Sequence, residues 1–203
     1  MKKLTFIILF GLASLTATTT SKAQEVDWRI VGGLNFAYVE ETPQLLDAAS
    51  AFGYTLGVAA DIGSNLFLQP SVQYSSYGST VTLPSSSEGG TKHAIRANYI
   101  RVPLQAGLRL FEASSAIPFN IEGRAGLSQS FLVGFNDRVK SGSGTALSED
   151  DIAGMRTAGI VGAGVRLLFF SLDVEYEFGL TDLFVNNGST KLDALYVIFG
   201  GNF

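Results

Sequence analysis

The 203-residue chain contains no cysteine, which excludes both a disulfide framework and a cysteine-ligated metal site. Charged residues are also scarce, at 16% of the chain against about 25% in an average protein. Beyond the first two dozen residues, no apolar run reaches the roughly 20 residues that a membrane-spanning helix needs. Hydrophobic residues nevertheless make up 46% of the chain, enough to bury a core, so the composition argues for one folded domain rather than a disordered chain.

The N-terminal segment has the features of a secretory signal peptide. Lys2 and Lys3 supply a positive start, residues 4–15 are apolar, and Ser21-Lys22-Ala23 provides a small-residue cleavage site. A transmembrane anchor is the alternative, but the apolar stretch is too short and no stop-transfer pattern follows it. The sequence therefore predicts a signal peptide over residues 1–23.

The mature domain would span residues 24–203. Cleavage removes three lysines, which leaves 11 of the 14 basic residues against all 18 acidic residues, a formal charge of −7. Because binding to phosphate backbones requires a basic face, this balance argues against nucleic acid as a partner.

Beyond residue 27 the chain alternates between apolar residues and small or polar residues. Phe52, Tyr54 and Leu56 share one parity, for example, with Gly53 and Thr55 on the other. Successive side chains of a strand point to opposite faces, so this pattern predicts strands with one apolar face. The predicted strands cover about 28–39, 52–62, 66–75, 100–110, 118–132, 152–167, 170–178 and 195–203.

Eight long strands with one apolar face can close into either of two barrels. A soluble, lipocalin-like barrel places the apolar face inside, whereas a membrane barrel places it outside against lipid. The polar faces are rich in Gly, Ser and Ala, which suits a narrow interior. Aromatic residues lie near the strand ends, as interfacial girdles do. The connections alternate between long ones (40–50, 79–94, 133–151, 182–192) and short ones (63–65, 111–117, 168–169).

Long loops at one end and short turns at the other are typical of outer-membrane barrels. The predicted fold is therefore all-β: an eight-stranded antiparallel up-and-down transmembrane β-barrel in the outer membrane of a Gram-negative bacterium. Pro70 and Pro103 fall within predicted strands of this barrel. A closed barrel has no free edge on which a missing N–H donor is harmless, so we expect a local β-bulge at each proline.

Several strand segments resemble the PorT-like outer-membrane β-barrel family. Leu68-Gln69-Pro70, followed by Tyr74 and Gly78, is similar to that family's third strand (LQPE…Y…G). Residues 99–104 (YIRVPL) resemble its YLEIPL fourth strand, with Arg101 in place of an acidic residue. Gly162-Ala163-Gly164 resembles its glycine-rich sixth strand, and Tyr176 with residues 179–182 (GLTD) resembles its Y…GLTN motif. The resemblance implies an outer-membrane barrel, in a family that includes components of secretion or assembly machinery, and it transfers no catalytic residue.

The charged residues on the polar parity form a candidate site inside the predicted barrel. Asp173, Glu175 and Glu177 are spaced by two and so share one face of one strand. They could form an interior cation site, but the near-balance of charge favours a structural network of ion pairs, because buried charges persist only when they are paired. The predicted network contains Arg29, Asp61, Arg101, Arg109, Glu122, Arg124, Arg156, Arg166, Asp173, Glu175 and Glu177.

Two further groups could carry chemistry. His93, the chain's one histidine, lies in a predicted loop with Ser85, Ser86, Ser87 and Glu88, as a lipid-modifying enzyme of the outer leaflet would require. No nucleophile motif supports that interpretation, so a solvated loop histidine is favoured. Glu149-Asp150-Asp151 could bind a divalent ion or a lipopolysaccharide-bridging cation, although a solvated acidic turn is favoured. No cofactor is expected.

The sequence thus predicts a monomeric, non-enzymatic outer-membrane barrel with a filled interior. Its expected partners are membrane lipid and lipopolysaccharide, an unidentified protein at the long loops, and the barrel-insertion machinery, which would recognise the C-terminal strand ending at Phe203. The alternatives are a lipid-modifying enzyme of the outer leaflet, a secretion or assembly component, and a periplasmic ligand-binding barrel.

Overall fold

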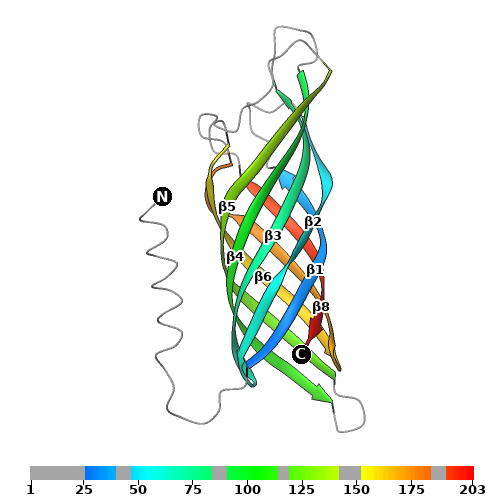
Figure 1. Ribbon diagram of the computed structural model, residues 1–203, viewed down its shortest axis with the longest axis vertical. Helices are drawn as coiled ribbons and strands as arrows, with labels where there is room; N and C mark the ends of the chain where they lie inside the picture. Colours follow the sequence, from blue (N-terminus) through cyan, green and yellow to red (C-terminus); the bar gives the residue numbers. More distant parts are fainter. Residues whose placement is uncertain (1–25, 40–46, 84–90, 114–118, 142–151, 184–190) are drawn as a thin grey trace.

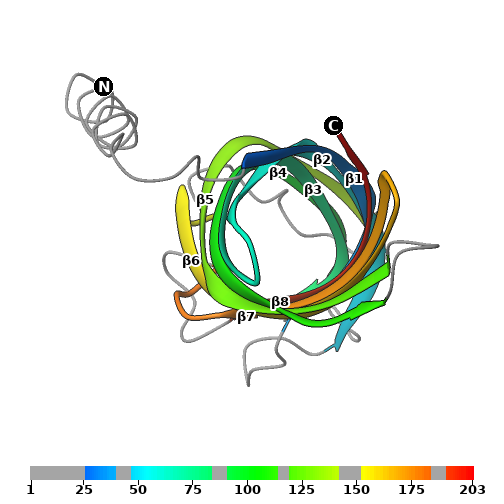
Figure 2. The same ribbon diagram turned by 90° about the horizontal axis from the view of Figure 1, so that it is seen from below.

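Eight antiparallel strands close into a single barrel (Figure 1, Figure 2). The computed structural model describes residues 26–39, 47–83, 91–113, 119–141, 152–183 and 191–203. The strands are β1 (Val26–Val39), β2 (Asp47–Gly63), β3 (Leu66–Leu83), β4 (Thr91–Ala113), β5 (Phe119–Ser141), β6 (Met155–Leu167), β7 (Phe170–Gly179) and β8 (Leu192–Asn202). No helix of the length and hydropathy needed for a membrane span occurs among these residues.

Each strand pairs with its neighbours in sequence, and the first pairs with the last. The β1–β8 ladder runs from Arg29 opposite Asn202 to Val39 opposite Leu192. Trp28 and Phe203 also exchange backbone hydrogen bonds of 3.3 and 3.0 Å. The predicted eight-stranded up-and-down barrel is confirmed, and its closure leaves no unpaired sheet edge between β1 and β8.

The alternating pattern places apolar side chains outside and polar ones inside. Along β7, exposed Phe170 and Leu172 alternate with buried Ser171 and Asp173. On the outer surface, the rings of Phe36 and Phe52 lie 4.6 Å apart between their centroids. A soluble protein would bury such a face in its core, so the outward orientation is that of a barrel surrounded by hydrocarbon.

The two ends of the barrel differ in the lengths of their connections. At the lower end in Figure 1, residues 64–65 join β2 to β3 and residues 168–169 join β6 to β7. At the upper end β3, β4 and β5 extend well beyond the neighbouring strands. We call these the short-turn end and the long-strand end.

The predicted long connections are partly strand. β3 continues to Leu83, β4 begins at Thr91 and β5 continues to Ser141, whereas residues 79–94 and 133–151 were expected to be loops. The error has a physical cause, because the outward apolar alternation stops in these extensions: Val81 and Leu83 of β3, for example, fall on the parity of the interior. His93 therefore lies in β4, with its backbone paired to Val81 and Val139.

Several predictions concern residues outside the described part of the chain. These are the signal peptide over 1–23, the serine-rich segment with Glu88, and the acidic segment 149–151.

The bulges expected at Pro70 and Pro103 are not found, so that prediction is wrong. Pro70 lies opposite Leu104, and the same β3–β4 register continues at Gln73 opposite Arg101, although the intervening positions are not paired. The missing donors are accommodated by this short lapse in pairing rather than by an extra residue. The shifts in register occur elsewhere, between Ala51 and Tyr54 in β2 and at three places along the β4–β5 ladder.

Candidate functional site: the barrel interior

All of the predicted network residues point into the barrel and have buried side chains. The charged side chains that the structure brings together there, with exposed fractions of 9% or less, are Arg29, Asp61, Arg101, Arg109, Glu122, Arg124, Arg156, Arg166, Asp173, Glu175 and Glu177. They come from β1, β2, β4, β5, β6 and β7. Because these residues share the interior parity of their strands, their charges lie together in one enclosed space.

Asp61 is a junction of the network toward the short-turn end. Its Oδ1 lies 3.1 Å from the Nη2 of Arg29, and its Oδ2 bonds to Arg166. Arg29 also reaches Asp173 across the β1–β8–β7 wall, at 3.3 Å. Glu122 lies 3.0 Å from Arg166 and 3.2 Å from Arg124. Each carboxylate thus bridges two guanidinium groups from different strands.

The middle of the interior is organised around the acidic column of β7. Arg124 bonds to Asp173, and its second amino group lies 3.9 Å from Glu175. Arg101 contacts Glu175 at 3.3 Å and Glu177 at 2.7 Å. The three carboxylates of β7 are therefore neutralised by arginines that reach across the barrel from β4 and β5.

Three glutamines add hydrogen bonds to these charges. Gln69 donates to Asp61 at 2.5 Å and accepts from Arg124 at 3.1 Å. Gln105 donates to Glu175 at 2.9 Å, and Gln73 accepts from Arg101 at 2.8 Å. Gln69, Gln73 and Gln105 have the polar parity of their strands, although the sequence analysis did not include them in the network. Their parity was the signal, since an interior residue must hydrogen bond within the barrel.

Asp27 is a network residue that sequence analysis missed. Its Oδ2 lies 3.5 Å from Arg109 and 3.3 Å from Arg166, and its side chain is 36% exposed at the short-turn end. Its position two residues before Arg29 gives it the interior parity, which could have identified it. With Asp27 included, six arginines face six carboxylates in the described interior.

Three tyrosines form a layer above the charged network, toward the long-strand end. The hydroxyls of Tyr77 and Tyr196 bond to each other, and the ring of Tyr99 meets that of Tyr77 edge-on at 5.7 Å. The guanidinium of Arg101 lies 4.4 Å from the centre of the Tyr196 ring, within cation–π range. The guanidinium of Arg156 lies between 5 and 6 Å from the rings of Tyr77 and Tyr99. These contacts join the charged layer to an aromatic one.

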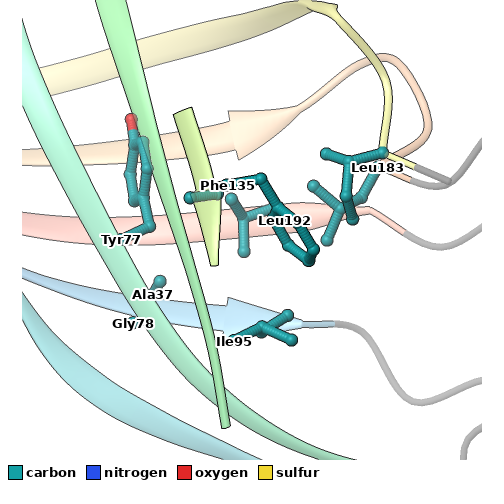
Figure 3. A pocket seen from close by; sticks show the side chains of 9 residues that line it. Ala37, Tyr77, Gly78, Ile95, Phe135, Leu183 and Leu192 are labelled. Atoms are coloured by element: carbon teal, nitrogen blue, oxygen red, sulfur yellow. The ribbon is translucent and has the colours of Figure 1, made fainter. Parts of the chain in front are cut away.

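Above the tyrosines the interior becomes apolar (Figure 3). Ile152 and Leu183, which precede β6 and follow β7, are each only 3% exposed and are held together by a 2.8 Å hydrogen bond from Ala153 to the Leu183 carbonyl. The remaining side chains of this apolar seal come from the strands: Ala37, Ile95, Ala97, Phe135 and Leu192. The cavity among them measures about 20 Å³, room for roughly one water molecule, and its apolar lining offers water no partners.

The opposite end of the interior is open. A cavity of about 550 Å³ lies at the short-turn end. Its lining residues are Asp27, Arg109, Asn120, Arg166, Leu168, Phe169, Asn202 and Phe203. We call it the vestibule. The interior thus has a polar opening at one end, a charged middle, and an apolar seal at the other.

The charged side chains of the described interior are arranged as ion pairs rather than as a metal site. No group of three or more His, Asp or Glu side chains among the described residues is arranged to hold a metal ion. The interior carboxylates are already bonded to arginines, and removing either partner of a buried pair would leave an uncompensated charge. The arrangement is suited to filling and bracing the barrel.

Comparison with known proteins identifies a family and several proteins of similar structure. A family model described as "Outer membrane protein beta-barrel domain" matches residues 16–185. The structure is similar to OprG of Pseudomonas aeruginosa at 15% identity, covering 89% of this chain and 97% of OprG with a TM-score of 0.48. It is similar to the attachment invasion locus protein Ail of Yersinia pestis at 17% identity, covering 88% and 99% of the two chains with a TM-score of 0.45. A search of curated proteins finds no match.

Proposed function

The chain belongs to the outer membrane protein beta-barrel domain family, and from that premise we propose that it is a closed, non-conducting barrel with a structural or interaction role at the cell surface. Outer-membrane barrels place their short turns in the periplasm and their longer connections outside. The short-turn end is then periplasmic and the long-strand end extracellular. The exposed apolar wall and the family argue against the alternative of a soluble periplasmic barrel.

The filled interior is the observation that carries this proposal. Arg101 and Arg124 cross the middle of the barrel to carboxylates of β7, Arg156 on the adjacent strand β6 pairs with Glu177, and the apolar seal closes the extracellular end. Eight strands enclose a space just wide enough for side chains, whereas open porins use about 16–18 strands. A filled interior of this kind does not suit solute transport. The extracellular surface of the barrel is therefore the better candidate for the functional site.

The proposed interaction role assigns partner binding to the extracellular connections. A direct test replaces residues 84–90 or 142–151 with Gly-Ser linkers of equal length and compares the proteins that cross-link to each variant in native membranes. Replacement of the periplasmic residues Ser64 and Asn65 is the matched control. The proposal predicts that a specific cross-link is lost in an extracellular variant while the barrel still folds. A cross-link pattern identical in all the variants would contradict it.

We also propose that the protein is not an enzyme, and substitution of His93 tests this part of the proposal. His93 would have to act with a nucleophile and an acidic residue at the outer leaflet, and its backbone lies within the β3–β4–β5 ladder. We expect lipid A from cells carrying His93→Ala to have the same mass spectrum as lipid A from wild-type cells. A change in acyl chains that follows the substitution would establish a lipid-modifying enzyme instead.

The narrower PorT-like assignment, with its link to secretion or assembly machinery, is supported by the strand motifs alone. Leu68-Gln69-Pro70 lies on β3, where Gln69 bonds to the charged network, and Pro103 lies on β4. A deletion strain that secretes its usual set of proteins unchanged would argue against a secretion component while leaving the structural role intact.

A further inference from the structure

The turn between β6 and β7 consists of two large apolar residues at the short-turn end. Leu168 and Phe169 form it, and each side chain is 56% exposed. Hairpin turns of two residues normally carry glycine, asparagine or aspartate, which tolerate both water and left-handed backbone angles. The turn between β2 and β3 follows that rule, because Ser64 and Asn65 are polar and Gly63 supplies the positive φ, of 122°. The two short turns therefore differ in chemistry.

Leu168 holds its place in the turn under backbone strain. Its φ of 54° lies in the left-handed region, and no other non-glycine residue of the described chain has a positive φ. A Cβ atom is crowded by a carbonyl oxygen in this conformation, and glycine would relieve the crowding. Strained backbone of this kind points to a function for the side chain that it carries.

The apolar surface of the turn is continuous with the lipid-facing wall. The ring of Phe169 lies 4.2 Å from that of Phe170, the first residue of β7, between centroids. The Phe169 carbonyl accepts a 2.7 Å hydrogen bond from the Asn202 amide, which places the turn beside the exposed Phe203. Phe203 in turn pairs with the exposed Trp28. A contiguous exposed apolar patch marks contact with a membrane or with a protein.

The height of the wall at β7 favours a membrane as the occupant. The outward apolar residues of β7 run from Phe170 to Phe178, eight residues further along the chain. At about 3.3 Å per residue and a tilt of about 40°, this wall is roughly 20 Å tall, against roughly 25 Å for the apolar band of outer-membrane barrels. Its upper limit is Asp193, whose carboxylate accepts hydrogen bonds from the Tyr176 hydroxyl and the Gly179 amide at 2.6 and 2.9 Å. The missing height therefore lies below Phe170, at the turn.

The wall formed by β4 needs no such addition. Its outward residues are apolar from the half-buried Ile100 to the exposed Leu110, ten residues further along the chain. By the same geometry this stretch is roughly 25 Å tall and spans the apolar band by itself. The barrel is thus short of apolar wall at β7 and not at β4.

We infer that Leu168 and Phe169 insert into the periplasmic leaflet of the outer membrane, among the acyl chains of its phospholipids. The turn thereby completes the apolar band where β7 is too short to do so. The rim of the vestibule then lies at the membrane surface on this side, because Leu168, Phe169 and Phe203 form part of that rim. The inference rests on the proposed function for the orientation of the barrel only, and the surface role does not enter it.

Fluorescence quenching in vesicles tests the depth of the turn. Trp28 is the one tryptophan of the chain, so Trp28→Phe provides a background for Phe169→Trp and, as the matched control in the polar turn, Asn65→Trp. In vesicles of phosphatidylcholine brominated on its acyl chains, Phe169→Trp should lose most of its emission, as should Leu104→Trp on the outer wall. Asn65→Trp should instead be quenched by iodide in the water.

Quenching of Phe169→Trp by iodide and not by the brominated lipid would overturn the inference, because the turn would then face water and be free for a protein partner. Depth is measured whichever end of the barrel faces the vesicle interior. A negative result therefore overturns the membrane contact of the turn and leaves the proposed surface role intact.

A second variant tests whether the apolar side chains are needed to span the bilayer. Leu168→Asn combined with Phe169→Gly introduces a favoured hairpin turn and removes the strain together with the apolar surface. We expect its folded fraction to equal that of the wild type in thin dilauroyl phosphatidylcholine bilayers and to fall roughly twofold or more below it in thicker dioleoyl bilayers. Equal folded fractions of variant and wild type in both bilayers, or an equal loss in both, would overturn the inference.

Discussion

The carboxylate of Glu177 joins two arginines that come from different walls of the barrel. Its Oε2 lies 2.7 Å from the Nε of Arg101 on β4, and its Oε1 lies 2.8 Å from the Nη2 of Arg156 on β6. All three side chains are at most 1% exposed. Glu177 therefore connects β4 to β6 and β7 through the middle of the barrel, and it lies at the boundary between the charged network and the tyrosine layer.

Replacing Glu177 should destabilise the barrel strongly. Glu177→Gln removes the negative charge that two buried guanidinium groups share, and breaking a fully buried pair costs about 3–5 kcal/mol. We expect the midpoint of urea unfolding in lipid bilayers to fall well below that of the wild type. Asp182→Asn, at an exposed position beyond β7, is the control and should change stability by about 0.5 kcal/mol or less. Equal midpoints for the two variants would show that the network does not hold the barrel together.

The orientation of β4 predicts different effects at adjacent positions. Leu104 is 52% exposed on the outer wall, and Gln105 is buried beside Glu175. Leu104→Arg places a charge against hydrocarbon and should cost about 2–4 kcal/mol near the midplane of the bilayer. Gln105→Arg keeps a donor facing Glu175, so its cost should be smaller. The free energies of unfolding of both variants in the same bilayer provide the comparison, and the reverse order would mean that the faces are inverted.

Phe203 is predicted to act in membrane insertion. It directly follows β8, its aromatic ring is 76% exposed, and its backbone pairs with Trp28 at the closing seam. Deleting Phe203 should lower the amount of folded, heat-modifiable protein in outer-membrane fractions, because the insertion machinery would lose its C-terminal signal and the seam would lose two hydrogen bonds. Phe199→Leu keeps the terminal residue and an apolar outer face, and should preserve the yield. An undiminished yield after the deletion would be evidence against the signal.

The parity of each strand could be predicted from the sequence because membrane and interior impose opposite chemistry on alternate residues. Asp173, Glu175 and Glu177 were placed inside on that basis, and so were their arginine partners. Which arginine meets which acid could not be predicted, since this depends on the tilt and register of strands far apart in the chain. Arg29 and Asp173, for example, are 144 residues apart.

The upper parts of the barrel were less predictable for a different reason. In the extension Ser79–Leu83 the apolar residues Val81 and Leu83 fall on the parity of the interior, so the outward apolar alternation that marks the rest of β3 stops there. The apolar seal was missed as well, because Ile152 and Leu183 lie beyond the ends of β6 and β7 and close the interior only when the barrel forms. The vestibule likewise depends on residues such as Asn120 and Asn202, which only the closed sheet brings together.

Conductance across a planar bilayer tests whether the interior is filled. The purified wild-type protein, with ion pairs in its middle and an apolar seal at its long-strand end, should show no steady single-channel conductance. The double variant Ile152→Ser, Leu183→Ser opens the seal but keeps the charged network, so it should remain closed as well. Stable, large, porin-like steps from the wild-type protein would show that the interior is open, because they would require a continuous water-filled path where the structure places Arg101, Glu177 and the tyrosine layer.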